Sequence, residues 1–136
     1  MSTRGIIGYR QGGKDFLFYN HQDSYPENLG RRVCAMITSG NVTPSELTEE
    51  EDGTDFVGDS VCCQYGYVMN NDDQVLEFYK GMNTDPDAPG RYTKTGSWTD
   101  PDDKKEYFGI RLVKNIHYEL IRNTPEANWL QLFRED

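Results

Sequence analysis

Residues 6–19 read IIGYRQGGKDFLFY, and this stretch decides the predicted fold. Two short runs of β-prone residues, 6–9 and 16–19, lie on either side of Gly12-Gly13. Consecutive glycines accept the positive φ angles of a tight turn, which lets two strands fold back on each other. The sequence therefore predicts a β-hairpin over residues 3–20.

A helix is predicted directly after this hairpin, from about Pro26 to Ser39. Proline is favoured at the first helical position, and Glu27 suits the positive end of the helix dipole. Four apolar residues recur at helical spacing, namely Leu29, Val33, Met36 and Ile37. Gly40 is the expected end of the helix because glycine readily takes a left-handed conformation.

Strand patterns return in the second half of the chain. Residues 65–69 and 74–79 flank four turn-forming residues, which predicts a second hairpin. Two more strands are predicted, at 107–113 and at 116–121. Residues 83–103 hold Asp-Pro and Pro-Gly pairs and are predicted to be a loop.

Two segments carry weaker patterns. Residues 43–46 have the spacing of a capping box, so a short helix is expected from there through Leu47. Residues 129–133 form either a strand or a short helix. The whole pattern predicts a single α+β domain over residues 1–136. Its mostly antiparallel sheet is built from hairpins and packs against one principal helix at 26–39.

Composition narrows the functional classes. The 136 residues include 23 acidic and 14 basic ones, for a net charge of −9, which argues against direct binding of nucleic acid. The chain has no apolar run of the roughly 20 residues needed to cross a bilayer and no basic-then-apolar leader, so neither a membrane nor export is expected. Its three cysteines are odd in number and lack CxxC spacing, which favours a reducing cytoplasm over a disulfide framework or a zinc site.

The start of the chain resembles a known family. Thr3-Arg4-Gly5 precedes the first strand, and residues 19–30 read YNHQDSYPENLG. This pattern is similar to that of small uncharacterised proteins from bacteriophages and bacteria, over about residues 3–30. The resemblance implies a viral or mobile-element origin and therefore a place in the host cytoplasm, and it supplies no activity.

Three functions are compatible with these observations. The first is that of an accessory protein that binds a host or viral protein partner, as a monomer or small homo-oligomer and without a cofactor. Tyrosines beyond the needs of one small core favour a binding surface, a pocket or an oligomer contact. Trp98, near the end of the predicted loop, either belongs to a partner-binding segment or pins the loop to the core. The tyrosines are Tyr65, Tyr67, Tyr79, Tyr92, Tyr107 and Tyr118.

The second function is that of an N-terminal-nucleophile amide hydrolase. After removal of Met1, Ser2 or Thr3 would offer a hydroxyl beside its own α-amine, which can act as a general base. The antiparallel hairpin would bring the polar junction after Tyr19 back beside this terminus. The supporting groups would be Arg4, Asn20, His21 and Asp23. The arrangement resembles the opening of penicillin-acylase-like and amidotransferase-like enzymes. In the alternative interpretation, Asp23 or Ser24 caps the helix that Pro26 begins. Asn20 and His21 then satisfy loop backbone groups, and Arg4 pairs with a nearby carboxylate.

The third function is that of an acidic inhibitor that imitates DNA. Glu49, Glu50, Glu51 and Asp52 are the centre of a dense acidic segment that could occupy a basic protein surface. A solvated loop that only maintains solubility explains the same residues. No metal site is predicted, because neither this segment nor the aspartates at 100–103 match the ligand spacing of a calcium loop.

Overall fold

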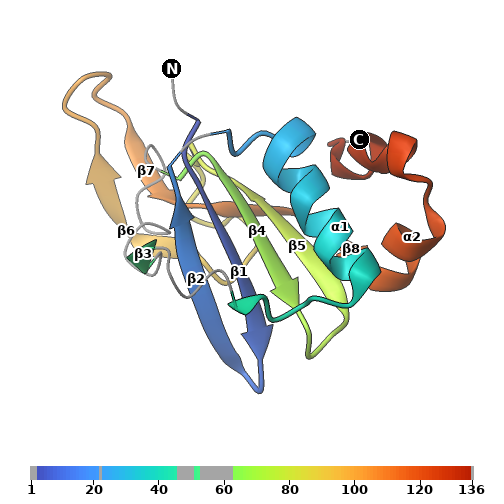
Figure 1. The fold of residues 1–136 in the computed structure, drawn as a ribbon. Helices are drawn as coiled ribbons and strands as arrows, with labels where there is room; N and C mark the ends of the chain where they lie inside the picture. The colour runs from blue at the N-terminus through green and yellow to red at the C-terminus, as the bar shows by residue number, and fades with distance from the viewer. Residues whose placement is uncertain (1–2, 22, 46–50, 53–62, 136) are drawn as a thin grey trace.

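A computed structural model describes residues 3–21, 23–45, 51–52 and 63–135, with backbone alone at 51–52 and 94–98. Within these residues the chain forms a six-stranded sheet with helices on one face (Figure 1), which confirms the α+β class. The strand order is β3-β2-β1-β4-β5-β8. The bounds are β1 (Gly5–Gln11), β2 (Lys14–Asn20), β3 (Glu51–Asp52), β4 (Tyr65–Asn70), β5 (Val75–Lys80) and β8 (Arg111–His117).

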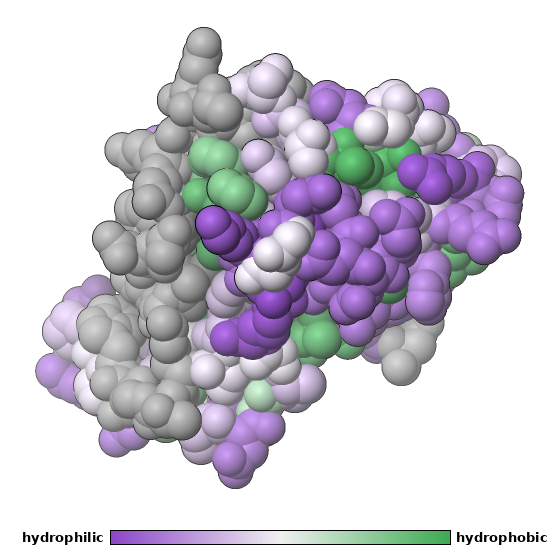
Figure 2. Space-filling model, turned by 90° about the horizontal axis from the view of Figure 1, so that it is seen from below, coloured by the Kyte–Doolittle hydropathy of each residue, from purple (hydrophilic) through white to green (hydrophobic). Residues whose placement is uncertain are grey.

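Both predicted hairpins are confirmed, and their turns lie at the same end of the sheet. Gly12 and Gly13 have φ angles of 60° and 75° in the β1–β2 turn, as the two-glycine pattern indicated. The carboxylate of Asp72, in the β4–β5 turn, accepts hydrogen bonds from these two backbone amides at 2.9 and 2.8 Å. These bonds lower the pKa of Asp72. Seen from this end, hydrophilic residues cover much of the described surface (Figure 2).

A parallel pair joins the two hairpins at the centre of the sheet. β1 runs alongside β4 in a register from Gly5 opposite Tyr65 to Arg10 opposite Asn70. Gly5 permits this approach, since a Cβ atom there would lie 2.5 Å from the Tyr65 carbonyl oxygen and 2.8 Å from the Ser24 side chain. The sheet is therefore mostly antiparallel with one parallel pair, which the hairpin patterns did not predict.

The predicted helix is confirmed as two consecutive elements. A π-helical turn, η1 (Pro26–Gly30), leads into α1 (Arg31–Ser39), and Gly40 ends it in a left-handed conformation with φ of 82°. A side-chain cap by Asp23 or Ser24 was expected, but the helix begins without one. Backbone amides of Asn28 and Leu29 instead donate to the Tyr25 carbonyl at 2.9 and 3.0 Å.

The helices cover one face of the sheet. α1 packs there beside α2 (Tyr118–Asn123) and the 3-10 helix η4 (Glu126–Phe133), on the right in Figure 1. The core beneath them includes Ile7, Val33, Ile37, Tyr67, Leu76, Phe78, Ile116, Ile121 and Phe133. A two-stranded sheet of β6 (Thr93–Thr99) and β7 (Glu106–Gly109) projects away from the helices.

Three predictions in the second half were wrong. β6 lies inside the segment predicted to be a loop, and it gains its partner, β7, only through a turn at 100–105. The strand predicted at 107–113 is broken after Gly109, whose φ of 68° turns the chain out of β7 and toward β8. The strand predicted at 116–121 becomes α2 after His117, because Tyr118 and Ile121 are buried at helical spacing on the α1 side. The short helix predicted through Leu47 extends outside the described residues.

All the tyrosines of this surplus except Tyr65 are buried, so the set does not form an exposed surface. Tyr67, Tyr79, Tyr92, Tyr107 and Tyr118 are all at most 7% exposed. The reason is that the sheet is covered on both faces, so the chain has more interior than a sheet with one covered face. The second apolar cluster consists of Ile6, Leu17, Tyr19, Cys63, Val68, Tyr79, Tyr92 and Ile110.

An ion network closes this second face. Arg91 reaches back from the segment before β6 and donates to the buried carboxylate of Glu77 and, at 2.8 Å, to Asp15. Glu77 also accepts from Asn70 at 3.1 Å and from the Tyr79 hydroxyl at 2.9 Å. Because this buried carboxylate is fully engaged by its neighbours, the network acts as a structural clamp on the loop.

Candidate functional site

The polar junction after β2 is closed around Ser24. This residue is 0% exposed, and each of its polar groups is engaged. Its amide donates to the Thr3 carbonyl at 3.1 Å, its hydroxyl accepts from Asn20 at 2.8 Å, and its carbonyl accepts from the Tyr67 hydroxyl at 2.7 Å. Burial raises the pKa of Tyr67, so its phenol stays protonated as a donor. Ser24 thus ties β1, β2 and β4 together.

The hairpin does bring the start of the chain beside this junction, as the hydrolase hypothesis requires. Thr3 lies next to Ser24 and is only 4% exposed, whereas His21 and Asp23 are exposed. Asp23 has a left-handed φ of 58°, and the His21 ring meets that of Tyr19 edge-on with centroids 4.6 Å apart. The Arg4 carbonyl accepts from the Gln64 amide at 2.9 Å, so this residue is fixed beside β4.

A shallow depression of about 290 Å³ lies on the outer side of the junction. Asn20 and Asp23 line it together with four residues of the following helix, Glu27, Asn28, Leu29 and Arg32. Ser2 lies outside the described residues, so its proximity to this depression stays a prediction. The described part of the junction is a packed structural element next to a polar depression.

The acidic segment and Trp98 are described only in part. Glu49 and Glu50 lie outside the described residues. The backbones of Glu51 and Asp52 form β3, opposite Tyr19 and Phe18 of β2. Trp98 lies in β6 opposite Tyr107, and its side chain is outside the description. The described backbone therefore places part of the acidic run at the edge of the main sheet.

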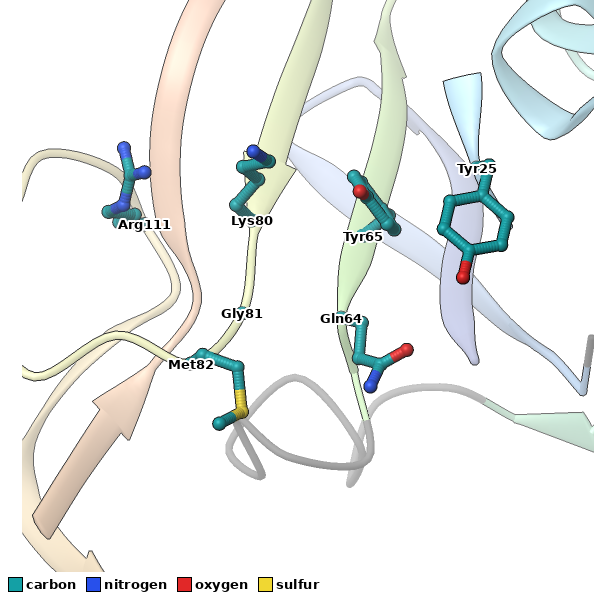
Figure 3. A pocket seen from close by; sticks show the side chains of 7 residues that line it. All are labelled: Tyr25, Gln64, Tyr65, Lys80, Gly81, Met82 and Arg111. Atoms are coloured by element: carbon teal, nitrogen blue, oxygen red, sulfur yellow. The ribbon is translucent and has the colours of Figure 1, made fainter. Parts of the chain in front are cut away.

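A larger pocket lies at the opposite end of the sheet from the hairpin turns. Its seven lining residues are Tyr25, Gln64, Tyr65, Lys80, Gly81, Met82 and Arg111 (Figure 3), and we call it the Tyr25 pocket. Its volume is about 460 Å³.

A row of side chains across neighbouring strands builds this pocket. Tyr65 of β4 is directly opposite Lys80 of β5, and Lys80 is directly opposite Arg111 of β8. Tyr25, just before the helix, extends the row, with its ring centroid 5.8 Å from that of Tyr65 (Figure 3). Since cross-strand neighbours share one face of a sheet, the row lies on the helix-covered face, beyond the ends of the helices.

The apolar members of the pocket are unusually open. Tyr25 is 44% exposed and Met82 is 48% exposed, although both are large apolar side chains. Met82 also has a left-handed φ of 54°, a conformation that costs free energy for a residue with a Cβ atom. The protein therefore maintains an exposed thioether in a strained backbone position at the edge of a pocket.

A carboxylate from the C-terminal segment meets the two cations of the row. Glu135 accepts from the Lys80 ammonium at 2.8 Å and from the Arg111 guanidinium at 2.7 Å. These two hydrogen bonds lower the pKa of Glu135. Next to them, the Lys114 ammonium donates to the Arg134 carbonyl at 3.0 Å. This edge of an otherwise acidic chain therefore carries a local cluster of positive charge.

Sequence reasoning missed this pocket. The predicted turn at 70–73 would place Tyr65 opposite Phe78, whereas the observed turn at 71–74 places Tyr65 opposite Lys80. Tyr25 and Arg111 become neighbours of that pair only through the helix start and the β5–β8 pairing. Among the described residues, Cys34 is the one thiol in the core beneath the helices. Burial raises its pKa to about 12, so it stays protonated and is a poor nucleophile.

Comparison with known proteins adds no relative: no family model, curated protein or solved structure matches the chain. None of the helices in the described ranges is long and apolar enough to cross a membrane. The described side chains also contain no group of three or more His, Cys, Asp or Glu residues placed to hold a metal ion.

Proposed function

We propose that this protein is a phage-type accessory protein that binds a host or viral protein in the host cytoplasm, and that a segment of this partner enters the Tyr25 pocket. The observation that carries the proposal is the pair of exposed apolar side chains, Tyr25 and Met82, in a pocket beside two cations. Exposed apolar area of this kind is characteristic of protein-binding surfaces. Tyrosine, methionine and arginine are also the residue types enriched there.

The chemistry of the pocket lining favours binding over catalysis. Its seven residues include no carboxylate, imidazole or thiol, so the lining offers no ordinary general base near neutral pH. It offers instead two aromatic rings, a thioether that adapts to the shape of a partner, and two fixed positive charges. These groups suit a segment that carries both an apolar and a charged side chain.

Site-specific photocrosslinking tests the proposal. We would place the photoreactive residue p-benzoylphenylalanine at Met82 and, in a matched control, at Leu120, which is 51% exposed on α2 outside the pocket. A partner bound in the pocket should crosslink at position 82 and not at position 120. The crosslinked protein would be identified, purified and titrated against the wild type and against Tyr25→Ser.

The expected result is about tenfold weaker binding of the purified partner to Tyr25→Ser, because an aromatic anchor at an interface contributes at least about 1.4 kcal/mol. The same crosslinked proteins at both positions, or equal affinity of wild type and Tyr25→Ser, would contradict the proposal.

The N-terminal-nucleophile hydrolase remains a second candidate, because the hydrogen bond from the Ser24 backbone amide to the Thr3 carbonyl holds the start of the chain beside Asn20. Ser2 would be the nucleophile, since Thr3 is 4% exposed and closed to a substrate. The intact mass of the purified protein tests this mechanism. Removal of Met1 alone would leave a free Ser2 amine, whereas retention of Met1 would rule out the hydrolase mechanism.

A further inference from the structure

We infer that the partner segment bound by the Tyr25 pocket is acidic, and that its carboxylate replaces Glu135 between Lys80 and Arg111. The C-terminal segment would then be an internal competitor, since its Glu135 carboxylate, which lies outside the pocket lining, engages both cations of the pocket in the free protein. This inference rests on the proposed function and specifies the chemistry of the ligand.

Glu135 demonstrates that the two cations can share one carboxylate. One of its oxygens accepts from Lys80 at 2.8 Å, and the other accepts from Arg111 at 2.7 Å. The cations project from directly paired positions on β5 and β8, so the sheet sets their spacing. A carboxylate from another chain would find the same two donors already in position, without reorganising the strands.

The surrounding charge selects an acidic ligand over a basic one. Lys80 and Arg111 contact the Glu135 carboxylate, and two further basic residues, Lys114 and Arg134, line the neighbouring depression together with Glu135. The whole chain, in contrast, has a net charge of −9. An acidic segment would therefore be repelled by most of the protein and attracted to these basic residues.

The contact with Glu135 is weak enough to be exchanged. The side chains of Lys80, Arg111 and Glu135 are 33%, 35% and 37% exposed, so water screens all three charges. Exposed ion pairs of this kind change an equilibrium by no more than about fivefold. A ligand carboxylate would leave neither cation unpaired, and Glu135 would return to solvent.

The aromatic half of the pocket specifies the neighbour of this carboxylate. Lys80 lies 5.8 Å from the centre of the Tyr65 ring, and Tyr25 continues the aromatic row away from the cations. An acidic residue on Lys80 and Arg111 would therefore place an adjacent aromatic side chain between Tyr25 and Met82. The expected ligand is a protein segment that alternates acidic and aromatic residues.

The test uses the full-length protein and a fluorescein-labelled peptide probe of sequence Glu-Phe-Glu-Phe-Glu, with binding measured by fluorescence polarisation. Glu135→Gln should bind this probe up to about fivefold more tightly than the wild type, because the internal competitor loses its charge. Glu126→Gln, the same change at an exposed position of η4, is the matched control and should leave the affinity unchanged. Lys80→Gln and Arg111→Gln should each weaken binding, and a Lys-Phe-Lys-Phe-Lys probe should not bind.

Several outcomes would overturn the inference. Equal affinities of Glu135→Gln and Glu126→Gln would show that Glu135 does not compete. Displacement of the peptide by millimolar inorganic phosphate would identify a general anion site instead. If the photocrosslinked partner depends on Tyr25 but not on Lys80 or Arg111, the acidic ligand is wrong and the proposed binding function stands. If the partner is independent of Tyr25 as well, both proposals fail.

Discussion

Ser24 and Tyr25 are consecutive residues with opposite environments. Ser24 is 0% exposed and holds three strands together through its backbone and hydroxyl, while Tyr25 is 44% exposed and lines the Tyr25 pocket. The chain thus changes from a closed junction to an open pocket within one residue. The difference teaches that the polar signature after β2 is mainly an anchor, and that the pocket proposed to bind a partner begins where the anchor ends.

The same contrast recurs two residues apart on β4. Tyr67 and Tyr65 point to the same face of the sheet, because side chains alternate along a strand. Tyr67 is 0% exposed beneath the helices, whereas Tyr65 lies half-buried beyond them, in the pocket. The position along the strand relative to the helix layer therefore decides whether a tyrosine is buried in the core or lines the pocket.

A side chain added where the β1 backbone approaches β4 should have the largest effect on stability among the variants that test this comparison. Gly5→Ala would place a methyl group 2.5 Å from the Tyr65 carbonyl oxygen, and a paired backbone atom cannot yield without loss of the β1–β4 register. We expect the free energy of unfolding to fall by about 3 kcal/mol, measured by urea denaturation. Gly66→Ala is the control, since its nearest contacts, at 3.1 and 3.2 Å, are side-chain atoms of Tyr79 and Ile110. Equal losses in the two variants would contradict a special role for the Gly5 approach.

Loss of the hydroxyl group should lower the free energy of unfolding more at Tyr67 than at Tyr65 of β4. Tyr67→Phe leaves the buried Ser24 carbonyl without its donor, so we expect a loss of about 1–2 kcal/mol in the free energy of unfolding. Tyr65→Phe, a half-buried position in the pocket, should change stability by less than about 0.5 kcal/mol. Thermal and urea unfolding of both variants would measure the difference. A Tyr65→Phe variant as unstable as Tyr67→Phe would remove the distinction between anchor and pocket.

A third pair compares the adjacent residues themselves. Ser24→Ala should lower the free energy of unfolding by about 1 kcal/mol, because the Asn20 amide loses its buried acceptor. Tyr25→Ser should leave stability within about 0.5 kcal/mol of the wild type while it weakens partner binding. Ser24→Ala should therefore differ from the wild type in the unfolding assay, and Tyr25→Ser should differ from it in the binding assay. A destabilised Tyr25→Ser that binds normally would reverse the assignment.

The smallest expected effect is the pH dependence of the Glu135 contact. The pKa of this carboxyl is lowered in the folded protein, so its contribution to stability is present above the ordinary value of about 4.3 and is lost as the pH falls through the folded pKa. We expect wild type and Glu135→Gln to differ by at most about 0.5 kcal/mol near neutral pH, and to converge in acid. Urea unfolding at a series of pH values would measure this. A difference that grew on acidification would have the wrong sign.

The parts of the fold that local rules control were predictable. Gly12-Gly13 determined the first hairpin, and Pro26 with Gly40 marked the two ends of the helical segment. The parallel β1–β4 pair was not predictable, because it joins residues about 60 positions apart and has no local signal. β6 was missed for a related reason, since turn-rich sequence hid a strand that pairs, among the described residues, with β7 alone.

The candidate site divides in the same way. The polar residues 20–24 attracted attention because they are concentrated in sequence, and Ser24 and Asn20 do bond to each other. The Tyr25 pocket draws on four separate segments, so no short motif could indicate it. Only the cross-strand registers of β4, β5 and β8 bring Tyr65, Lys80 and Arg111 into one row.

The central position of β1 has a consequence for synthesis on the ribosome. The β1–β2 hairpin can form early, but the other edge of β1 stays unpaired until residues 65–70 of β4 have emerged. At translation rates of about 5–20 residues per second, the 50 residues from the end of β2 to the end of β4 take roughly 2.5–10 s. During that time the nascent chain displays an apolar strand edge, Ile6 and Ile7 included, that can pair with other chains. We therefore expect slower translation after residue 30 to lower the soluble yield of the protein.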